Sequence, residues 1–260
     1  MEPVTLSPPP LSPPRYEETI YVGKHNERKQ ETPEPEPETE PVFEFKIELS
    51  SIKVALNVIN TLTHFFLGAI VFGAFTIANS GIYSNGHYRS STPFSIHIYF
   101  CVIGYVVLMS QAILSFNTHG GWAHGFKYPQ KKKIHSSMQI GGSLLAICGC
   151  IVKIACWDYY APYNLGHVIT GWIAMLLTFL SLIGGYLNFK HADKIRESRY
   201  KNWHKYLGFL TLSMAFLCLC LGFGDWDNYY GGNASAALSI MFTVFAFIGI
   251  LIAAVHTKIY

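Results

Sequence analysis

Long apolar runs separated by short polar connections fill the chain from about residue 50 onwards. In a helix, about 20 apolar residues span a hydrocarbon core of about 30 Å, and six runs reach that length. They are Val54 to Ala78, Phe94 to Phe116, Ile134 to Trp157, Leu165 to Phe189, Trp203 to Phe223 and Ala234 to Val255. Because the connections are short, neighbouring helices should run antiparallel. The pattern predicts an all-α integral membrane protein, a six-transmembrane-helix bundle.

Residues 1–50 have a different composition. They hold ten of the 13 prolines and eleven of the 16 acidic residues, and their only apolar run is Val42 to Ile47. Such a segment buries too little apolar surface to fold and is typical of a disordered tail. We therefore divide the chain into a Pro/Glu-rich cytosolic tail, residues 1–50, and a transmembrane domain, residues 51–260. The tail does not have the pattern of a cleaved signal peptide, so the first helix would target the chain to the membrane.

The basic residues predict an orientation. With a cytosolic amino terminus, twelve Lys and Arg residues of the transmembrane domain lie at cytosolic helix ends, and only Arg89 and Lys153 lie on the opposite side. This excess follows the positive-inside rule. We expect a multi-pass membrane protein with both termini in the cytosol, in an endomembrane (endoplasmic reticulum or vesicle) or in the plasma membrane. No nucleic-acid partner is expected, and a homodimer is an open alternative.

Four successive spans, the second to the fifth, each carry a histidine close to their start. These are His97, His135, His167 and His204. An ionisable residue inside a span is costly and indicates function. Because consecutive helices alternate in direction, His97 and His167 should lie near the non-cytosolic face, and His135 and His204 near the cytosolic face. The histidines thus form two pairs, one in each leaflet.

Two neutral imidazoles from facing helices can hold a haem iron in a six-coordinate site, which favours electron transfer over oxygen binding. The pattern therefore predicts a four-helix di-haem core, with the two haem levels separated by most of the hydrocarbon thickness. A histidine-based metal or proton transporter without haem is the alternative. Such transporters usually add intramembrane carboxylates, and no Asp or Glu interrupts the six runs.

Small residues accompany the paired histidines. Gly171 and Gly208 follow the histidine of their helix by four residues, and Gly104 and Gly142 follow theirs by seven. We assign these glycines to the face that a flat macrocycle would occupy, although glycines also allow close helix packing.

The six cysteines lie in apolar segments, and none forms a CxxC pair with a nearby histidine. We expect buried packing residues and no zinc site. The cysteines are Cys101, Cys148, Cys150, Cys156, Cys218 and Cys220.

The segments around the histidines, FSIHIYF, KKKIHSSMQ, NLGHVITGW and NWHKYLGF, place them 38, 32 and 37 residues apart. In these motifs the chain resembles the cytochrome b561 family over about Val54 to His256. The stretches LMSQAILSFNTH and NLGHV look more like its short cytochrome b561 domain-containing subgroup than its ascorbate-specialised members. The resemblance implies a transmembrane ascorbate-dependent (ferri)reductase with two haem b groups, one held by His97 and His167 and the other by His135 and His204. It also implies cytosolic ascorbate as the donor and monodehydroascorbate or ferric iron as the acceptor.

Three further features remain open. Lys133 stands two residues before His135, where members of the family place a lysine that contacts ascorbate, but an ordinary positive-inside lysine is the favoured interpretation. His64 lies outside the ligand set and suits a packing or supporting role. In the tail, Pro13, Pro14 and Tyr16 form PPRY, a pattern that WW domains bind, and a chance match is at least as common in so Pro-rich a segment.

Overall fold

The computed structural model describes residues 42–79, 82–84, 87–89, 92–117, 121–156, 165–190, 198–230 and 233–256. Side chains are described for residues 51–79, 92–117, 121–156, 165–190, 200–225 and 234–256. The PPRY residues Pro13, Pro14 and Tyr16 lie outside the described residues.

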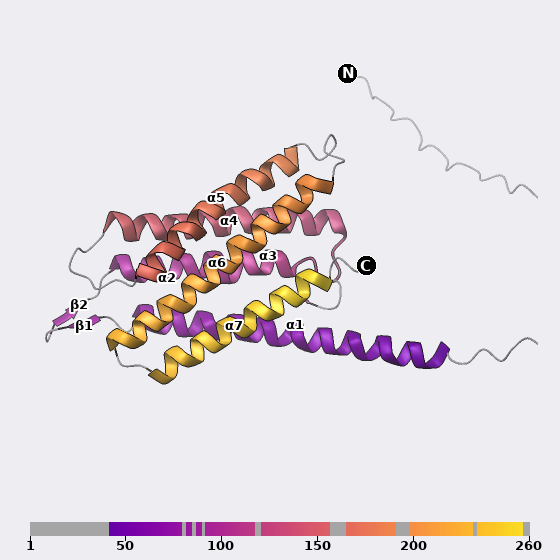
Figure 1. Cartoon of the computed structure of the whole chain (residues 1–260), viewed down its shortest axis with the longest axis horizontal. Coiled ribbons are helices and arrows are strands. Elements are labelled where there is room, and N and C mark those ends of the chain that lie inside the picture. Colours follow the sequence, from indigo (N-terminus) through magenta and orange to yellow (C-terminus); the bar gives the residue numbers. More distant parts are fainter. Residues whose placement is uncertain are drawn as a thin grey trace, which may run out of the picture. The chain divides into compact units, whose positions relative to one another are not determined.

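Six helices within the described residues are long and apolar enough to cross a membrane (Figure 1). The spanning segments are Ser51–Asn79, Thr92–Leu114, Tyr128–Ala155, Leu165–Lys190, Tyr200–Asp225 and Ala234–His256. Each overlaps one apolar run of the sequence, so the prediction of an all-α, six-helix membrane architecture is confirmed.

The helices are α1 (Val42–Asn79), α2 (Thr92–Cys101), η1 (Val102–Met109), α3 (Ser110–Leu114), α4 (Tyr128–Ala155), α5 (Leu165–Lys190), α6 (Ser198–Tyr230) and α7 (Asn233–His256). The second span consists of α2, η1 and α3, which follow one another without a break. A short antiparallel hairpin of β1 (Ile82–Ser84) and β2 (His87–Arg89) lies between α1 and α2. The sequence did not predict this hairpin, because three-residue strands are too short to show an alternating pattern.

The first helix begins earlier than the composition suggests. α1 begins at Val42, inside the segment 1–50 that we assigned to a tail. The apolar run from Val42 to Ile47 directly precedes the first span, and it continues the helix towards the amino terminus instead of belonging to an unstructured segment.

Neighbouring helices pack in pairs. α5 packs along α6, α4 packs along α2 and η1, and α7 packs along α6 (Figure 1). α1 contacts α7 through the stacked rings of Phe66 and Phe242, and it contacts α2 through Phe75 and Tyr99. The four helices that carry the predicted ligands are therefore in mutual contact, with α1 and α7 beside them.

Two spans approach each other closely at a π-helix. η1 lies in the middle of the second span, and π-helical segments often mark functional sites. A Cβ atom added to Gly104 of η1 would lie 2.5 Å from the carbonyl oxygen of Gly142 in α4. Only glycine fits at this crossing, so Gly104 and Gly142 serve close helix packing, which was the alternative stated for them above.

The outer surface of the helices is apolar. Large side chains such as Phe72, Leu176 and Trp203 are exposed around the bundle. An apolar surface of this extent is unusual for a protein in water, but it suits a lipid environment. Inside the bundle, hydroxyl groups bond to carbonyls of their own helix, as Thr178 does to Ala174 and Thr211 does to Leu207. Such pairing is what hydrocarbon surroundings require.

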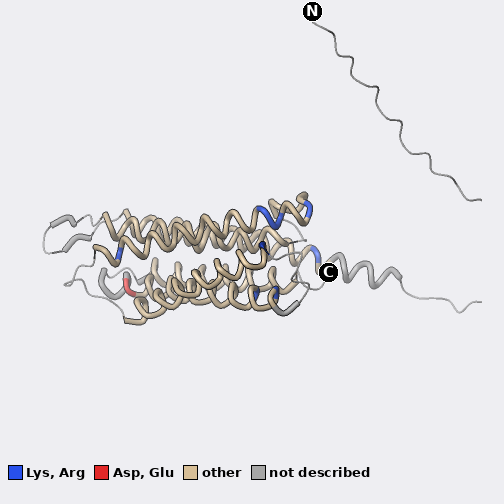
Figure 2. Tube along the Cα trace, turned by 90° about the horizontal axis from the view of Figure 1, so that it is seen from above, with Lys and Arg blue, Asp and Glu red and all other residues tan. Residues whose placement is uncertain are grey.

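Basic side chains gather at one end of the bundle. Figure 2 shows most of the described Lys and Arg residues at that end and the described acidic residue at the opposite end. Lys131 lies in the first turn of α4 and Lys153 in its last turn, so they mark the two ends. This asymmetry agrees with the charge pattern of the sequence.

Candidate functional site

The first pair of histidines joins α2 to α5. The ring centroids of His97 and His167 lie 6.2 Å apart, and the two ring planes are nearly perpendicular at 85°. Nδ1 of His97 lies 3.1 Å from the carbonyl oxygen of Gly149 in α4, and Nδ1 of His167 lies 2.9 Å from that of Cys218 in α6. A carbonyl only accepts hydrogen bonds, so each Nδ1 carries the proton and Nε2 is left as the metal-binding nitrogen.

The second pair joins α4 to α6. The centroids of His135 and His204 lie 6.4 Å apart at 89°, and Nδ1 of His135 donates to the carbonyl oxygen of Ala112 at 3.0 Å. Nδ1 of His204 is buried and, among the described residues, has no hydrogen-bond partner. Gly184 and Gly185 of α5 lie beside this ring, and a Cβ at Gly185 would stand 3.3 Å from its Cε1 atom. The two pairs therefore share one arrangement except for the missing partner of His204.

Both pairs have the dimensions of an axially coordinated iron. With metal–nitrogen bonds of about 2 Å and about 1.1 Å from each nitrogen to its ring centroid, two axial imidazoles have centroids about 6 Å apart. The observed separations match this value. Metal-bound histidines usually donate their other ring N–H to a carbonyl or carboxylate, as three of these four do. The residues present thus fit a haem held between each pair.

The two pairs lie at two levels of the bundle. His135 and Gly149, which accepts the bond from His97, are 14 residues apart on α4. His204 and Cys218, which accepts the bond from His167, are also 14 residues apart, on α6. At 1.5 Å per residue, both helices give a separation of about 21 Å along the helix axis. This is about two thirds of the hydrocarbon thickness.

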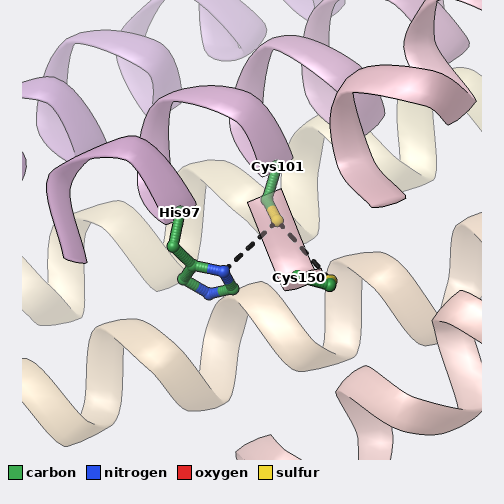
Figure 3. A group of neighbouring side chains, drawn as sticks. All are labelled: His97, Cys101 and Cys150. Carbon is green, nitrogen blue, oxygen red and sulfur yellow. Dashed lines mark hydrogen bonds between the residues drawn. The ribbon is translucent and has the colours of Figure 1, made fainter. Parts of the chain in front are cut away.

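Cysteines surround the first pair, an arrangement that the sequence did not predict. Sγ of Cys101 lies 3.6 Å from Nδ1 of His97 and 3.9 Å from Sγ of Cys150 (Figure 3). Sγ of Cys218 lies 3.4 Å from Nδ1 of His167. Spacing along the chain hid these contacts, because each thiol pairs across helices or one turn away rather than in a CxxC motif.

The expectation that the cysteines are buried packing residues needs correction. None of the six is fully buried, and Cys148 and Cys156 are exposed on the apolar surface, where lipid would surround them. In addition, the ligand atoms of His97, Cys101 and Cys150 all lie within 4.8 Å of one another, a spacing compatible with a small metal site. The bond from Nδ1 of His97 to Gly149 instead favours a hydrogen-bonded group.

The remaining glycines differ in their surroundings. A Cβ at Gly208 would meet no protein atom within 4 Å, and one at Gly171 would meet only Sγ of Cys218, at 3.5 Å. Gly149 and Gly222, which the sequence did not single out, directly contact the first pair. A Cβ at Gly222 would stand 3.1 Å from Cε1 of His167. Open space therefore remains beside α5 and α6, whereas the α2–α4 contact is tight.

Among the residues whose side chains are described, one cation at the basic end of the bundle is buried. Lys131, not Lys133, is buried, and its ammonium group donates to the carbonyl oxygen of Asn117 at 3.2 Å. Lys133 is exposed. On the neighbouring spans, Nε2 of Gln111 lies 2.8 Å from Nδ1 of His64, and the role of this histidine stays a prediction.

Six apolar helices that enclose two levels of facing imidazoles define a class of multi-pass membrane protein built to carry metal-centred cofactors between its helices. The sequence profile of eukaryotic cytochrome b561 matches residues 96–227, just over half of the chain, and this range includes all four paired histidines. The chain belongs to the cytochrome b561 family. It is a transmembrane oxidoreductase of a family that binds b-type haem and transfers electrons. No curated protein matches the chain at a significant level.

Proposed function

We propose that this protein carries electrons from cytosolic ascorbate, through two b-type haems, to monodehydroascorbate or ferric iron on the opposite side of the membrane. His97 and His167 would hold one haem, and His135 and His204 the other. One observation carries the proposal: two facing imidazole pairs occur at two levels of the bundle, each with the centroid spacing of an axially coordinated iron.

Haem, when bound, supplies the one-electron chemistry. The chain contributes the positions of the imidazoles. The carbonyls of Gly149, Ala112 and Cys218 bond to Nδ1 of three rings and leave their Nε2 atoms free of these bonds. Each carbonyl belongs to a membrane span that also carries a paired histidine, so the rings are held by the helical parts of the fold. Such preorganisation would hold the imidazoles in place in both oxidation states of a bound haem.

The direction of electron transfer across the membrane follows from the distribution of basic residues. The basic end of the bundle should face the cytosol according to the positive-inside rule, and it lies at the level of His135 and His204. An anionic donor such as ascorbate would be attracted there, and the exposed ammonium group of Lys133 is accessible for this role. The pair of His97 and His167 would then face the acceptor.

The test is a visible spectrum and a haem-to-protein ratio for the full-length protein and for two variants. Parent protein should contain two low-spin haems, partly reduced by ascorbate and fully by dithionite. The His97→Ala and His204→Ala variants should each retain one of the two haems. His64→Ala is a matched control, because His64 is also a histidine within a span but lies outside both pairs, and it should retain two.

Retention of two haems in both ligand variants would contradict the assignment of the ligands. Stoichiometric zinc without haem absorbance, in protein produced with adequate haem, would instead favour the transport alternative. Reduction by dithionite but not by ascorbate would leave the haem sites in place and exclude ascorbate as the donor.

A further inference from the structure

The two imidazoles of the first pair each have a second neighbour at Nδ1 besides a backbone carbonyl. For His97 the carbonyl oxygen of Gly149 lies at 3.1 Å and Sγ of Cys101 at 3.6 Å. For His167 the carbonyl oxygen of Cys218 lies at 2.9 Å and Sγ of the same residue at 3.4 Å. Hydrogen bonds to sulfur are longer than those to oxygen, so both thiols lie within range of the ring N–H.

The direction of these contacts follows from the other partners of the thiols. Sγ of Cys101 also lies 3.7 Å from the carbonyl oxygen of Ala146, and Sγ of Cys218 lies 3.4 Å from that of His167. A carbonyl only accepts, so each S–H donates to its carbonyl. The sulfur lone pairs are then left for the imidazole N–H, which is shared between an oxygen and a sulfur.

The second pair has no such contact among the described residues. His135 donates to the carbonyl of Ala112, and Nδ1 of His204 has no hydrogen-bond partner. Among the described residues, the thiols that contact a paired histidine are those of Cys101 and Cys218, and both contact the first pair. The two levels of the molecule therefore differ in the polar groups that support their ligands.

An acceptor at the second nitrogen of a metal-bound imidazole increases the basicity of the ligand. A more basic ligand stabilises ferric iron relative to ferrous iron, and hydrogen bonding around the ligands is a known determinant of haem potential. We propose that Cys101 and Cys218 are positioning residues whose sulfur atoms accept hydrogen bonds from His97 and His167 and thereby lower the reduction potential of the haem held by that pair. This inference rests on the proposed function.

The experiment is a redox titration of the full-length protein with both haems bound, followed through the absorbance of each haem. Cys101→Ala and Cys218→Ala remove the sulfur acceptor. Cys148→Ala on α4 and Cys220→Ala on α6 are matched controls, since they remove a thiol that makes no contact with the paired rings in the described structure. Cys101→Ser and Cys218→Ser keep a hydrogen-bond acceptor at these positions.

At a fixed ambient potential, each alanine variant should raise the ferrous-to-ferric ratio of one haem at least about threefold. For a one-electron couple this is a shift of about 28 mV, at 59 mV per tenfold change. The low-spin ferric EPR signal of the same haem should also shift. In the alanine variants, the reduction potential and EPR signal of the other haem should stay close to those of the parent protein. In the control and serine variants, both haems should stay closer to the parent potentials and signals.

Two haems at unchanged potentials in Cys101→Ala and Cys218→Ala would overturn the inference. Where alanine leaves a cavity that releases the haem, Cys101→Val and Cys218→Val replace the sulfur by a methyl group and should show the same rise. Loss of that haem from the alanine and valine variants, but not from the serine variants, would also support the hydrogen bond. Absence of haem from the parent protein would refute the proposed function instead.

Discussion

Replacing Gly104 by alanine should weaken both haem sites through one contact. The new Cβ would lie 2.5 Å from the carbonyl oxygen of Gly142, whereas ordinary van der Waals contact begins at 3.4 Å, so η1 and α4 must separate by about 0.9 Å. Overpacking of this kind typically costs about 1–3 kcal/mol. The second span, of which η1 is the middle part, is also joined to α4 by the bonds from His97 to Gly149 and from His135 to Ala112. Separating the segments would stretch both bonds.

The assay is the loss of haem absorbance on heating in detergent, with the haem content measured beforehand. Gly104→Ala should release haem at a lower temperature than the parent protein and contain less haem at each level. Gly68→Ala is the control, because a Cβ there meets no atom within 4 Å. Parent-like haem content and thermal stability in Gly104→Ala would show that the Gly104–Gly142 contact does not determine the spacing of the ligand helices.

Two further substitutions test the open space and the buried cation. Gly208→Leu adds a side chain where a Cβ meets no protein atom within 4 Å. If a porphyrin occupies that space, the haem content of this variant should fall to about one per chain. Gly68→Leu, which fills a similarly open position outside the four helices that carry the paired histidines, should retain two haems. Two haems in Gly208→Leu would show that no haem lies beside Gly208. Lys131→Ala removes a charged hydrogen bond to Asn117 and should cost about 1.5–3 kcal/mol, measured by thermal denaturation, whereas exposed Lys132→Ala should cost nothing measurable. Equal stability of the two lysine variants would contradict the role of the buried ammonium group.

The sequence predicted the spans and the proximity of the histidines within each pair. A run of about 20 apolar residues leaves few alternatives in a membrane, and the alternation of helix direction then assigns each histidine to a level. The facing rings of His97 with His167 and of His135 with His204 agree with that assignment. Their role as iron ligands stays a prediction.

The groups that support the ligands could not be predicted in the same way. Nδ1 of His97 bonds to a backbone carbonyl, and a carbonyl carries no residue identity that a sequence pattern could reveal. The thiol of Cys218 lies against a histidine 51 residues away, and only the rotation of α5 against α6 brings them together. Likewise, the spacing of Gly104 and Gly142 placed them on the ligand helices but did not show that they contact each other.

The shared use of α4 and α6 makes the bundle a spacer of fixed length. Each of these helices carries a paired histidine at one level and, 14 residues further on, the carbonyl that bonds to a paired histidine at the other. Sliding either helix along its axis would therefore disturb the hydrogen bonds of both levels at once, and the distance between the two levels should stay constant as long as these bonds hold.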